Sequence, residues 1–313
     1  MPRNGCEERR HLDGPRPMPE LPEVETIRRY LERSVLGKTI SSVEVRLPKL
    51  LSQSPLPDLS MLVGRQFTSA RRRAKVLILD TSNDLSLLVH FKLSGQLAII
   101  GPDGRRLVAG HPVPHPAGDF PHKASHVDIT FDDGTVVYYS DVRQFGWIRL
   151  MHWFDVGAAI AVFRFGPEGF GLPLDVKALG GKIRTRSIPI KALLLDQTFI
   201  AGLGNIYVDE ALFAARIHPG RPASSLTAPE RKRLLEAVPV ALGRGIEQGG
   251  AKIVHQKAFP IDQFPAVHGR EGEPCFVCGS TIGKTRVGGR GTYYCPGCQR
   301  VWRTRNKQAV ASA

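Results

Sequence analysis

Hydrophobic residues near the start of the chain recur with the period of a helix. Val24, Ile27 and Leu31 would share one helical face, and Pro22 suits a first helical turn. The carboxylates that follow this proline are also typical of a helix start, because they face the positive end of the helix. We therefore expect a helix over residues 22–36 that packs its apolar face onto a core.

The pattern then changes to short strands. Between residues 66 and 151, apolar residues occur in short or alternating runs bounded by turn residues, which is typical of a sandwich or flattened barrel. Strands are expected at 39–46, 75–80, 85–91, 96–100, 127–131, 136–139 and 147–151. The Asp-Asp-Gly at 132–134 predicts a hairpin turn. Loops are expected at 48–58 and at 101–123, which is rich in Pro, Gly and His.

Helical spacing returns after a Gly- and Pro-rich stretch at 166–174. Thr227 with Glu230 predicts a capping box that opens a long helix, and Pro239 within that helix predicts a kink or break. Helices are also expected around 191–196 and 206–217. The predicted strands are thus followed by predicted helices, which indicates separate domains. A chain of 313 residues is long enough for two or three modest domains.

Charge narrows the range of partners. The chain has 43 Lys and Arg against 29 Asp and Glu, and its net charge of +14 favours a polyanion. No run approaches 18 apolar residues and no basic amphipathic helix stands out, so nucleic acid is expected rather than a membrane. Residues 1–17 are polar, without periodicity or a signal-peptide run. We expect a disordered or spurious extension there and a cytoplasmic protein.

Four of the five cysteines form two close pairs near the C-terminus. Cys275-x-x-Cys278 and Cys295-x-x-Cys298 are separated by sixteen residues, a spacing that can close a tetrahedral four-thiolate zinc site with hairpin strands between the pairs. Two disulfides are the alternative, which the absence of a secretion signal disfavours. Because four cysteines leave no open coordination position, we expect one structural Zn²⁺.

Other basic and glycine-rich stretches have two interpretations each. The basic run at 71–75 could be the solvated end of a strand. The glycine-rich turn at 202–205 permits close backbone approach, but no strand precedes it, so it matches a dinucleotide-binding fingerprint poorly. Asn205 could simply cap a helix or turn, and Phe145 could be a core aromatic.

The stretch MPELPEVET, residues 18–26, places a proline and a carboxylate behind a methionine. Within a chain, a proline nitrogen is an amide without a nucleophilic lone pair. Freed by removal of Met18, Pro19 would carry a secondary amine that is partly neutral at physiological pH and can attack an aldehyde-like carbon to form an iminium. Glu20 beside it can move protons. We therefore expect the active protein to begin at Pro19.

The same stretch resembles the N-terminal signature of bacterial formamidopyrimidine-DNA glycosylases, which excise oxidised purines and nick the strand. An ordinary proline-capped helix is the alternative for these nine residues alone. The resemblance covers about residues 18–301 and includes five motifs in the expected order. It implies a DNA repair enzyme that acts on double-stranded DNA containing an oxidised base or an abasic site, expected to be a monomer with no membrane partner.

The resemblance also implies an α+β fold of several domains. An N-terminal β-sandwich with a catalytic N-terminal helix is expected over 18–165, and a linker over 166–176. A helix-two-turns-helix domain would cover 177–262, and a β-ribbon zinc finger would cover 263–301. Residues 302–313 would form a basic tail. DNA would lie in the cleft between the domains.

Roles are implied residue by residue. Pro19 would attack C1′ of the flipped nucleotide while Glu20 assists ring opening and proton transfer. Elimination on both sides of the opened sugar would then cut the strand. Lys75, and Arg290 shortly before the third cysteine, would hold the phosphates and help to expel them.

Five further residues are implied in DNA binding. Leu93, Arg143 and Phe145 would fill the gap left by the flipped base, with Arg143 pairing with the orphaned base. Asn205 and Arg186 would contact the DNA backbone.

The sequence departs from the family pattern at several positions. Gln144 stands in place of the usual second arginine, Leu93 in place of a common methionine, and Ala124 in place of a frequent histidine. The segment 251–267 is also short. Recognition of 8-oxoguanine is therefore less firmly implied than the chemistry.

Two other functions remain open. One is an endonuclease-VIII-like glycosylase for oxidised pyrimidines, although those relatives tend to have glycine in place of Leu21. The other is a non-catalytic zinc-ribbon protein that binds DNA, in which Pro19 stays acylated.

Overall fold

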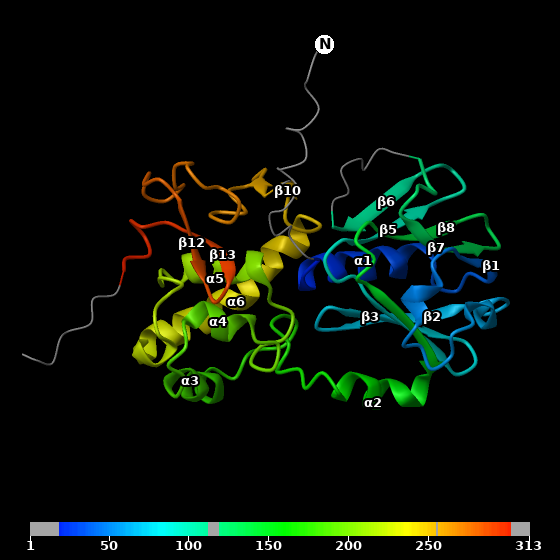
Figure 1. Ribbon diagram of the computed structural model, residues 1–313, viewed down its shortest axis with the longest axis horizontal. Coiled ribbons are helices and arrows are strands. Elements are labelled where there is room, and N and C mark those ends of the chain that lie inside the picture. The colour runs from blue at the N-terminus through cyan, green and yellow to red at the C-terminus, as the bar shows by residue number, and fades with distance from the viewer. Residues whose placement is uncertain (1–18, 112–118, 255, 302–313) are drawn as a thin grey trace, which may run out of the picture.

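The computed structural model describes residues 19–111, 119–254 and 256–301 (Figure 1). The extension expected at 1–17, Met18 and the basic tail expected at 302–313 lie outside the described residues. Within the described residues, strands form one half of the molecule, and helices with a small ribbon form the other (Figure 1).

Two antiparallel sheets make up the N-terminal half. One has the strand order β1-β7-β8-β5-β6, and the other has the order β2-β3-β4-β9. The strands are β1 Ile40–Val45, β2 Phe67–Arg73, β3 Val76–Thr81, β4 Leu85–His90, β5 Gly95–Ile100, β6 Arg106–Gly110, β7 Ser125–Phe131, β8 Val136–Asp141 and β9 Trp147–His152. Apolar side chains of both sheets, such as Leu77, Leu97 and Leu150, share one core. The expected sandwich is confirmed.

The structure corrects some of the element predictions in this half. β6 lies within the loop expected at 101–123, and its position at the edge of a sheet explains its weak apolar pattern. β2 was not expected because it ends in three arginines, yet it pairs along its length with β3. A short helix, α2 (Val156–Ala161), was also not expected. Short 3₁₀ helices occur at Pro48–Leu51, Leu59–Leu62, Trp153–Asp155 and Ala223–Ser225.

The N-terminal helix α1 (Leu21–Ser34) connects the two halves. Leu21 is buried in the core of the helical half, whereas Val24, Ile27 and Leu31 are buried in the core of the sandwich. Full burial of each such side chain contributes about 1.5–3 kcal/mol. The first turn of α1 is therefore held where the two halves meet (Figure 1).

Four helices form the second half: α3 Val176–Arg184, α4 Ile190–Leu195, α5 Asn205–Ala214 and α6 Ala228–Glu247. The expected capping box is confirmed, because the Thr227 hydroxyl accepts from the Glu230 N–H and the Glu230 carboxylate accepts from the Thr227 N–H. Of the kink or break expected at Pro239, the break is wrong, since α6 continues through this residue, and the kink stays a prediction. Burial of Val238 and Leu242 in the helical core stabilises the helix there despite the missing N–H.

Two hairpins complete the chain. β10 (Ile253–Val254) pairs with β11 (Lys257–Ala258), and β12 (Gly283–Val287) pairs with β13 (Arg290–Tyr294). Both sheets of the sandwich and both hairpins are antiparallel, so the α+β fold class is confirmed. None of the helices in the described ranges is long and apolar enough to cross a membrane.

Candidate active site

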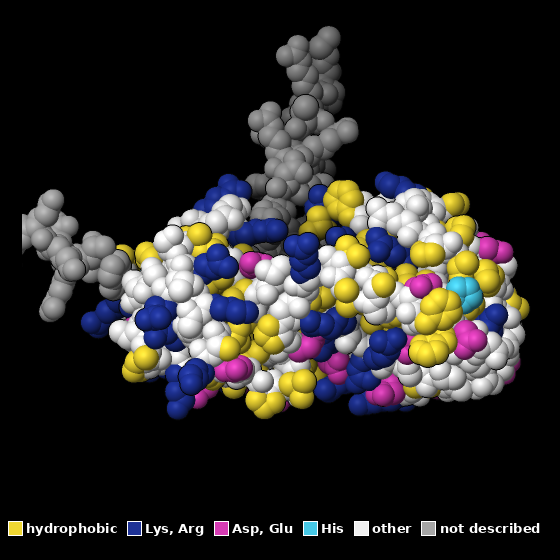
Figure 2. All heavy atoms as spheres, turned by 90° about the horizontal axis from the view of Figure 1, so that it is seen from below, with side chains coloured by type: hydrophobic (Ala, Val, Ile, Leu, Met, Phe, Trp, Pro, Cys, Tyr) yellow, Lys and Arg dark blue, Asp and Glu magenta, His cyan; other side chains and the backbone are white. Residues whose placement is uncertain are grey.

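A cleft of about 1260 Å³ lies between the sandwich, the helices and the β12–β13 hairpin. Its lining includes six of the expected site residues: Glu20, Lys75, Leu93, Arg143, Asn205 and Arg290. It also contains cationic side chains from other elements, including Lys92, Lys284 and Arg286. In Figure 2, Lys and Arg side chains are spread over the face in view, with Asp and Glu side chains among them.

Three of the nine expected catalytic and DNA-binding residues do not line this cleft within the described part of the chain. Pro19 is buried and directly precedes Glu20. Phe145 is 51% exposed on the loop that carries Arg143, so the core-aromatic alternative is wrong. Arg186 is exposed just beyond α3 and lies apart from the others.

The Glu20 carboxylate lies at the N-terminus of α5, where backbone N–H groups lack helical partners. Oε1 accepts from Ile206 N at 2.9 Å and Oε2 accepts from Tyr207 N at 3.4 Å. The side chain is only 1% exposed. Burial raises the pKa of Glu20 to about 7, although the Lys75 ammonium opposes this shift. At neutral pH this carboxyl can therefore both donate and accept a proton.

Two glycines allow α5 to approach α1 so closely. A Cβ atom at Gly204 would lie 2.2 Å from the carboxyl carbon of Glu20, and one at Gly202 would lie 2.3 Å from the side chain of Leu21. Leu21 N also donates to Gly202 O at 3.1 Å. The glycine-rich turn at 202–205 is thus explained by the approach of the protein's own N-terminal helix.

Glu23 links Glu20 to the segment 251–267. Its Oε2 accepts from Glu20 N at 2.9 Å, and its Oε1 accepts from Tyr207 OH at 2.8 Å and Ala251 N at 2.9 Å. The segment folds back through the β10–β11 hairpin, and Ile253 and Gln256 reach the cleft. Glu23 therefore connects the start of α1 to a segment that lines the cleft.

Lys75 lies in the turn between β2 and β3 and is 6% exposed. Burial lowers its pKa, while the carboxylates of Glu20 and Glu23 oppose this shift and Arg290 adds to it. The electrostatic interactions with Glu20 and Arg290 link the expected catalytic groups to one another. An ammonium with a lowered pKa releases its proton more easily than a solvated lysine does.

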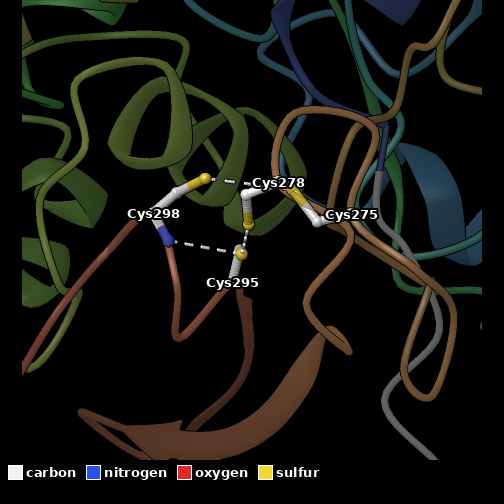
Figure 3. A group of neighbouring side chains, drawn as sticks. All are labelled: Cys275, Cys278, Cys295 and Cys298. Carbon is white, nitrogen blue, oxygen red and sulfur yellow. Dashed lines mark hydrogen bonds between the residues drawn. The ribbon is translucent and has the colours of Figure 1, made fainter.

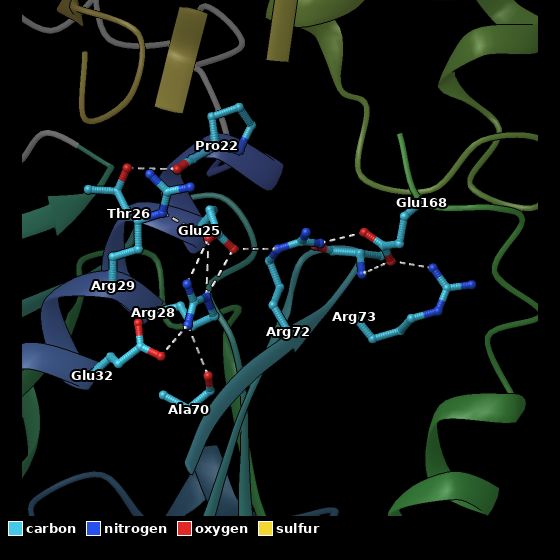
Figure 4. A network of polar contacts seen from close by, with 11 residues as sticks. Pro22, Glu25, Thr26, Arg28, Arg29, Glu32, Ala70, Arg72, Arg73 and Glu168 are labelled. Atoms are coloured by element: carbon cyan, nitrogen blue, oxygen red, sulfur yellow. Dashed lines mark hydrogen bonds and ion pairs between the residues drawn. The ribbon is translucent and has the colours of Figure 1, made fainter. Parts of the chain in front are cut away.

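The arginines before Lys75 are neutralised by acids of the protein itself. Arg72 contacts Glu25 and Glu168, Arg73 contacts Glu168, and Arg71 contacts Asp80. Figure 4 shows the chain of charges from α1 through Arg72 and Arg73 to Glu168, which lies in the linker before α3. Arg72 and Arg73 therefore hold the linker to the sandwich, and the solvated-edge interpretation fits only Arg71, whose side chain is 49% exposed.

Two side chains of the helical half hold the start of β13, where Arg290 lies. Asn205 Nδ2 donates to Gly291 O at 2.9 Å, and Lys191 Nζ donates to the same carbonyl at 3.0 Å. Lys191 is fully buried and pairs with Asp209 at 2.7 Å. Sequence analysis missed Lys191 and Asp209, because nothing in their spacing links them to a hairpin 100 residues away from Lys191.

The other oxygen of Asp209 extends this buried network to the segment before the finger. Oδ2 contacts His268 Nδ1 at 2.7 Å and accepts from Tyr293 N at 3.1 Å. Glu210, the next residue on α5, accepts from the backbone N–H groups of Ala266, Val267 and His268. Two neighbouring acids of one helix therefore fix both the hairpin and the segment that leads to it.

His90 is a further cleft residue that sequence analysis did not single out. Burial lowers its pKa to about 3, so the ring is neutral at physiological pH. Its Nδ1 accepts from Lys92 N at 3.0 Å, which leaves the proton on Nε2. His90 can therefore donate a hydrogen bond into the cleft without adding charge.

Comparison with known proteins identifies the family. Three family models match in order: the formamidopyrimidine-DNA glycosylase N-terminal domain at 18–148, the H2TH domain of the same enzymes at 165–257, and a zinc finger found in FPG and IleRS at 272–301. A formamidopyrimidine-DNA glycosylase from Bacillus anthracis is 38% identical over 289 residues, covering 90% of this chain and 99% of the relative. The chain belongs to the formamidopyrimidine-DNA glycosylase family.

Other members of the family agree in length and in structure. The enzyme of Pelotomaculum thermopropionicum is 38% identical, covering 91% of this chain and all of its own. Lactococcus lactis Fpg in complex with abasic-site DNA superposes with a TM-score of 0.77 at 33% identity, covering 90% of this chain and all of its own. The complex of the same enzyme with Fapy-dG DNA gives an equal TM-score of 0.77 at 34% identity, with the same coverage.

The zinc finger of this glycosylase family is recognisable in the four cysteines (Figure 3). Their Sγ atoms all lie within 4.8 Å of one another, with 3.9 Å between Cys275 and Cys298 and 3.4 Å between Cys278 and Cys295. Tetrahedral Zn–S bonds of about 2.3 Å place sulfurs about 3.8 Å apart, whereas a disulfide needs about 2.05 Å. The disulfide alternative is wrong, and the protein binds one structural zinc ion.

Proposed function

We propose that this protein is a bifunctional DNA glycosylase and AP lyase of base excision repair. It excises oxidised purines from double-stranded DNA through a Schiff base on Pro19 and then cuts the strand by β,δ-elimination. The observation that carries the proposal is the convergence of Glu20, Lys75 and Arg290 in one cleft of a chain that belongs to this family.

In the proposed chemistry, the Pro19 nitrogen forms a bond to C1′ as the bond from C1′ to the damaged base breaks. Glu20, whose pKa of about 7 leaves it partly protonated, donates a proton to the sugar ring oxygen as the ring opens. The resulting iminium acidifies the hydrogens of C2′, because it withdraws electrons from that carbon. The Glu20 carboxylate, having given up its proton, takes one from C2′, and the bond from C3′ to the 3′ phosphate breaks. Loss of the C4′ proton to solvent then breaks the bond from C5′ to the 5′ phosphate, and water hydrolyses the iminium to free Pro19.

Lys75 and Arg290 would bind the two departing phosphates. Their positions on opposite sides of the cleft, in the β2–β3 turn and on β13, suit a strand that passes between the two halves. Asn205 uses one amide hydrogen on Gly291 O, so its second amide hydrogen is available for a phosphate. Arg186 would contact the backbone farther along the duplex.

Free Pro19 requires that residues 1–18 are absent from the active species. The match to the N-terminal domain model begins at residue 18, which supports a functional start at this point. The test is borohydride trapping on abasic DNA, since only an iminium is reduced to a stable crosslink. A chain that begins at Pro19 should be trapped, and peptide mass analysis should locate the adduct on Pro19.

The matched control is the same chain with residues 1–18 retained and protected from processing. It should bind DNA through the same cleft but give no crosslink. A crosslink to this longer chain would move the nucleophile to another amine. No crosslink to either chain would favour the non-catalytic zinc-ribbon binder.

The lesion class needs a separate comparison. Ala251 N, just before β10, donates to Glu23, so α1 is bonded to the segment whose Ile253 and Gln256 line the cleft. We propose formamidopyrimidines and 8-oxoguanine as substrates, and single-turnover excision should be faster for them than for oxidised pyrimidines. The reverse order would indicate the endonuclease-VIII-like alternative. That the enzyme acts as a monomer in the bacterial cytoplasm stays a prediction.

A further inference from the structure

The residues expected to fill the gap left by the flipped base come from two separate loops. Leu93 lies between β4 and β5, and Arg143 and Phe145 lie between β8 and β9. Each loop crosses from one sheet of the sandwich to the other, because β4 and β9 belong to one sheet and β5 and β8 belong to the other. The pairs His90–Trp147 and Gly95–Asp141 place the two crossings side by side.

Asp141 is the centre of the contacts between these loops. It is fully buried, and its Oδ1 accepts from the hydroxyl of Ser94, the residue after Leu93. The same Oδ1 accepts from Arg143 N at 3.2 Å, and Oδ2 accepts from Gly146 N at 2.7 Å. One carboxylate therefore bonds both ends of its own loop and reaches the neighbouring loop.

Ser94 also connects the β4–β5 loop to the backbone of the β8–β9 loop. Its Oγ accepts from Arg143 N at 2.9 Å while it donates to Asp141. The backbone of Arg143 is thus hydrogen-bonded to a residue adjacent to Leu93. The bond from Ser94 to Asp141 is both buried and charge-assisted, and such bonds are among the stronger hydrogen bonds in proteins.

The loop held in this way has a strained backbone at its tip. Gln144 has a φ of +56°, in the left-handed region that residues other than glycine adopt at a cost of about 1 kcal/mol or more. Its own N–H donates to Asp141 O at 3.2 Å. The backbone conformation of Gln144 determines the directions in which Arg143 and Phe145 leave the loop. The guanidinium of Arg143 lies 5.0 Å from the ring centre of Phe145.

We infer that Asp141 and Ser94 lock the two loops into a single wedge, so that Asp141 is a positioning residue for recognition of the base opposite the lesion. The inference rests on the proposed function and on the roles expected for Leu93, Arg143 and Phe145, which would enter the DNA together. Arg143 can discriminate between bases only if its guanidinium is held in one place. Its own side chain is exposed, so the backbone bonds to Asp141 and Ser94 supply that restraint.

The test uses Ser94→Ala, which removes a single hydroxyl, together with Asp141→Asn. Dissociation constants are measured for duplexes that contain a non-cleavable abasic-site analogue opposite each of the four bases. Discrimination is the ratio between the weakest and the tightest of the four constants. Ser94→Ala should lower this ratio about fivefold, because an arginine held in a fixed position confers discrimination of at least that size. Asp141→Asn should lower it in the same direction if it folds.

Two controls separate positioning from general destabilisation. Ser86 is also fully buried and donates to an aspartate, Asp80, but it lies on β4 away from both loops. Ser86→Ala should lower the melting temperature as much as Ser94→Ala does and leave discrimination unchanged. In an Arg143→Ala background, Ser94→Ala should change the ratio by less than about twofold, since the group that it positions is gone.

Several results would overturn the inference. Discrimination could be unchanged in Ser94→Ala, it could fall equally in Ser86→Ala, or the effect of Ser94→Ala could persist fully without Arg143. The readout is equilibrium binding, which requires no reaction at Pro19. Absence of a borohydride crosslink would therefore contradict the proposed function without deciding this inference.

Discussion

At the scale of single residues, the proton on Glu20 affects the stability of the fold and, in the proposed mechanism, the opening of the sugar ring. Its pKa rises from 4.5 to about 7 on burial, so the folded protein holds this proton more tightly than the unfolded chain does. The resulting stabilisation is fully present below pH 4.5 and is lost as pH rises through 7. The loss amounts to about 3 kcal/mol.

We therefore expect Glu20→Gln, which cannot ionise, to unfold at a higher temperature than the wild type at pH 8, with the difference shrinking toward pH 4.5. Base excision by the wild type should fall with rising pH around 7, because the protonated acid is needed at ring opening. Single-turnover excision and thermal unfolding across this range measure the two effects. A pH-independent difference in melting temperature would show that burial does not shift this group.

What the sequence could predict about single residues depended on local spacing. The four cysteines and the Pro19–Glu20 pair are recognisable because their chemistry lies within a few positions of one another. The environment of Glu20 was not predictable, since the amides that bind it are 186 and 187 positions away. The same holds for Lys191, whose partners Asp209 and Gly291 are distant in sequence.

At the scale of elements, the linker before α3 is fixed by Glu168. This carboxylate accepts from Arg72 Nη1 at 2.6 Å and from Ala74 N at 2.8 Å, and it also pairs with Arg73. Ala74 has a φ of +51° and directly precedes Lys75. Glu168 therefore holds a strained turn that carries an expected phosphate ligand, and it joins the sandwich to the linker (Figure 4).

Glu168→Ala should destabilise the protein by about 2 kcal/mol, because it leaves the nearly buried Arg72 with one partner fewer and Ala74 N without its acceptor. Arg71→Ala is the matched control from the same arginine run. The Arg71 side chain is 49% exposed, so loss of its pair with Asp80 should cost less than about 1 kcal/mol. Urea unfolding of both variants tests this, and equal losses would mean that the linker is not held by this contact.

The zinc finger is an element whose fold depends on its metal. Cys275→Ser should lose zinc and unfold the β12–β13 hairpin, since a structural zinc site contributes folding free energy directly. Strand signals of the sandwich should persist, because that core does not include finger residues. Metal content and nuclear magnetic resonance spectra would report both. DNA affinity should also fall, because an unfolded hairpin no longer holds Arg290 in the cleft. Full DNA binding by the zinc-free protein would contradict this prediction.

Helices and strands were predicted correctly where apolar and polar side chains alternate with the period of the element. The prediction failed where contacts with other parts of the chain determine whether an element forms or ends. β6 lies at an edge, and β2 is held by pairing with β3 and by acids at its arginines, so neither carries a strong apolar pattern. Conversely, Pro239 is a local signal for a break, which packing of α6 in the helical core outweighs.

At the scale of the whole molecule, α1 and the cleft join the sandwich, the helices and the finger into one binding surface. The cations that line this surface come from two of these parts: Lys75 and Lys92 from the sandwich, and Lys284, Arg286 and Arg290 from the hairpin. The cleft therefore has a cationic lining, which would attract a polyanion at long range.

Arg290→Ala should weaken binding to all DNA sequences and reduce the slope of log affinity against log salt by about 0.9, the value for one phosphate contact. Lys232 is the control, because its exposed side chain pairs with Glu236 on α6 and does not line the cleft. Lys232→Ala should leave the slope unchanged. Fluorescence titrations of undamaged duplexes between low and physiological salt measure both slopes. If Arg290→Ala instead altered preference for one base and left the slope unchanged, the arginine would read sequence, and the phosphate-binding role proposed for it would be wrong.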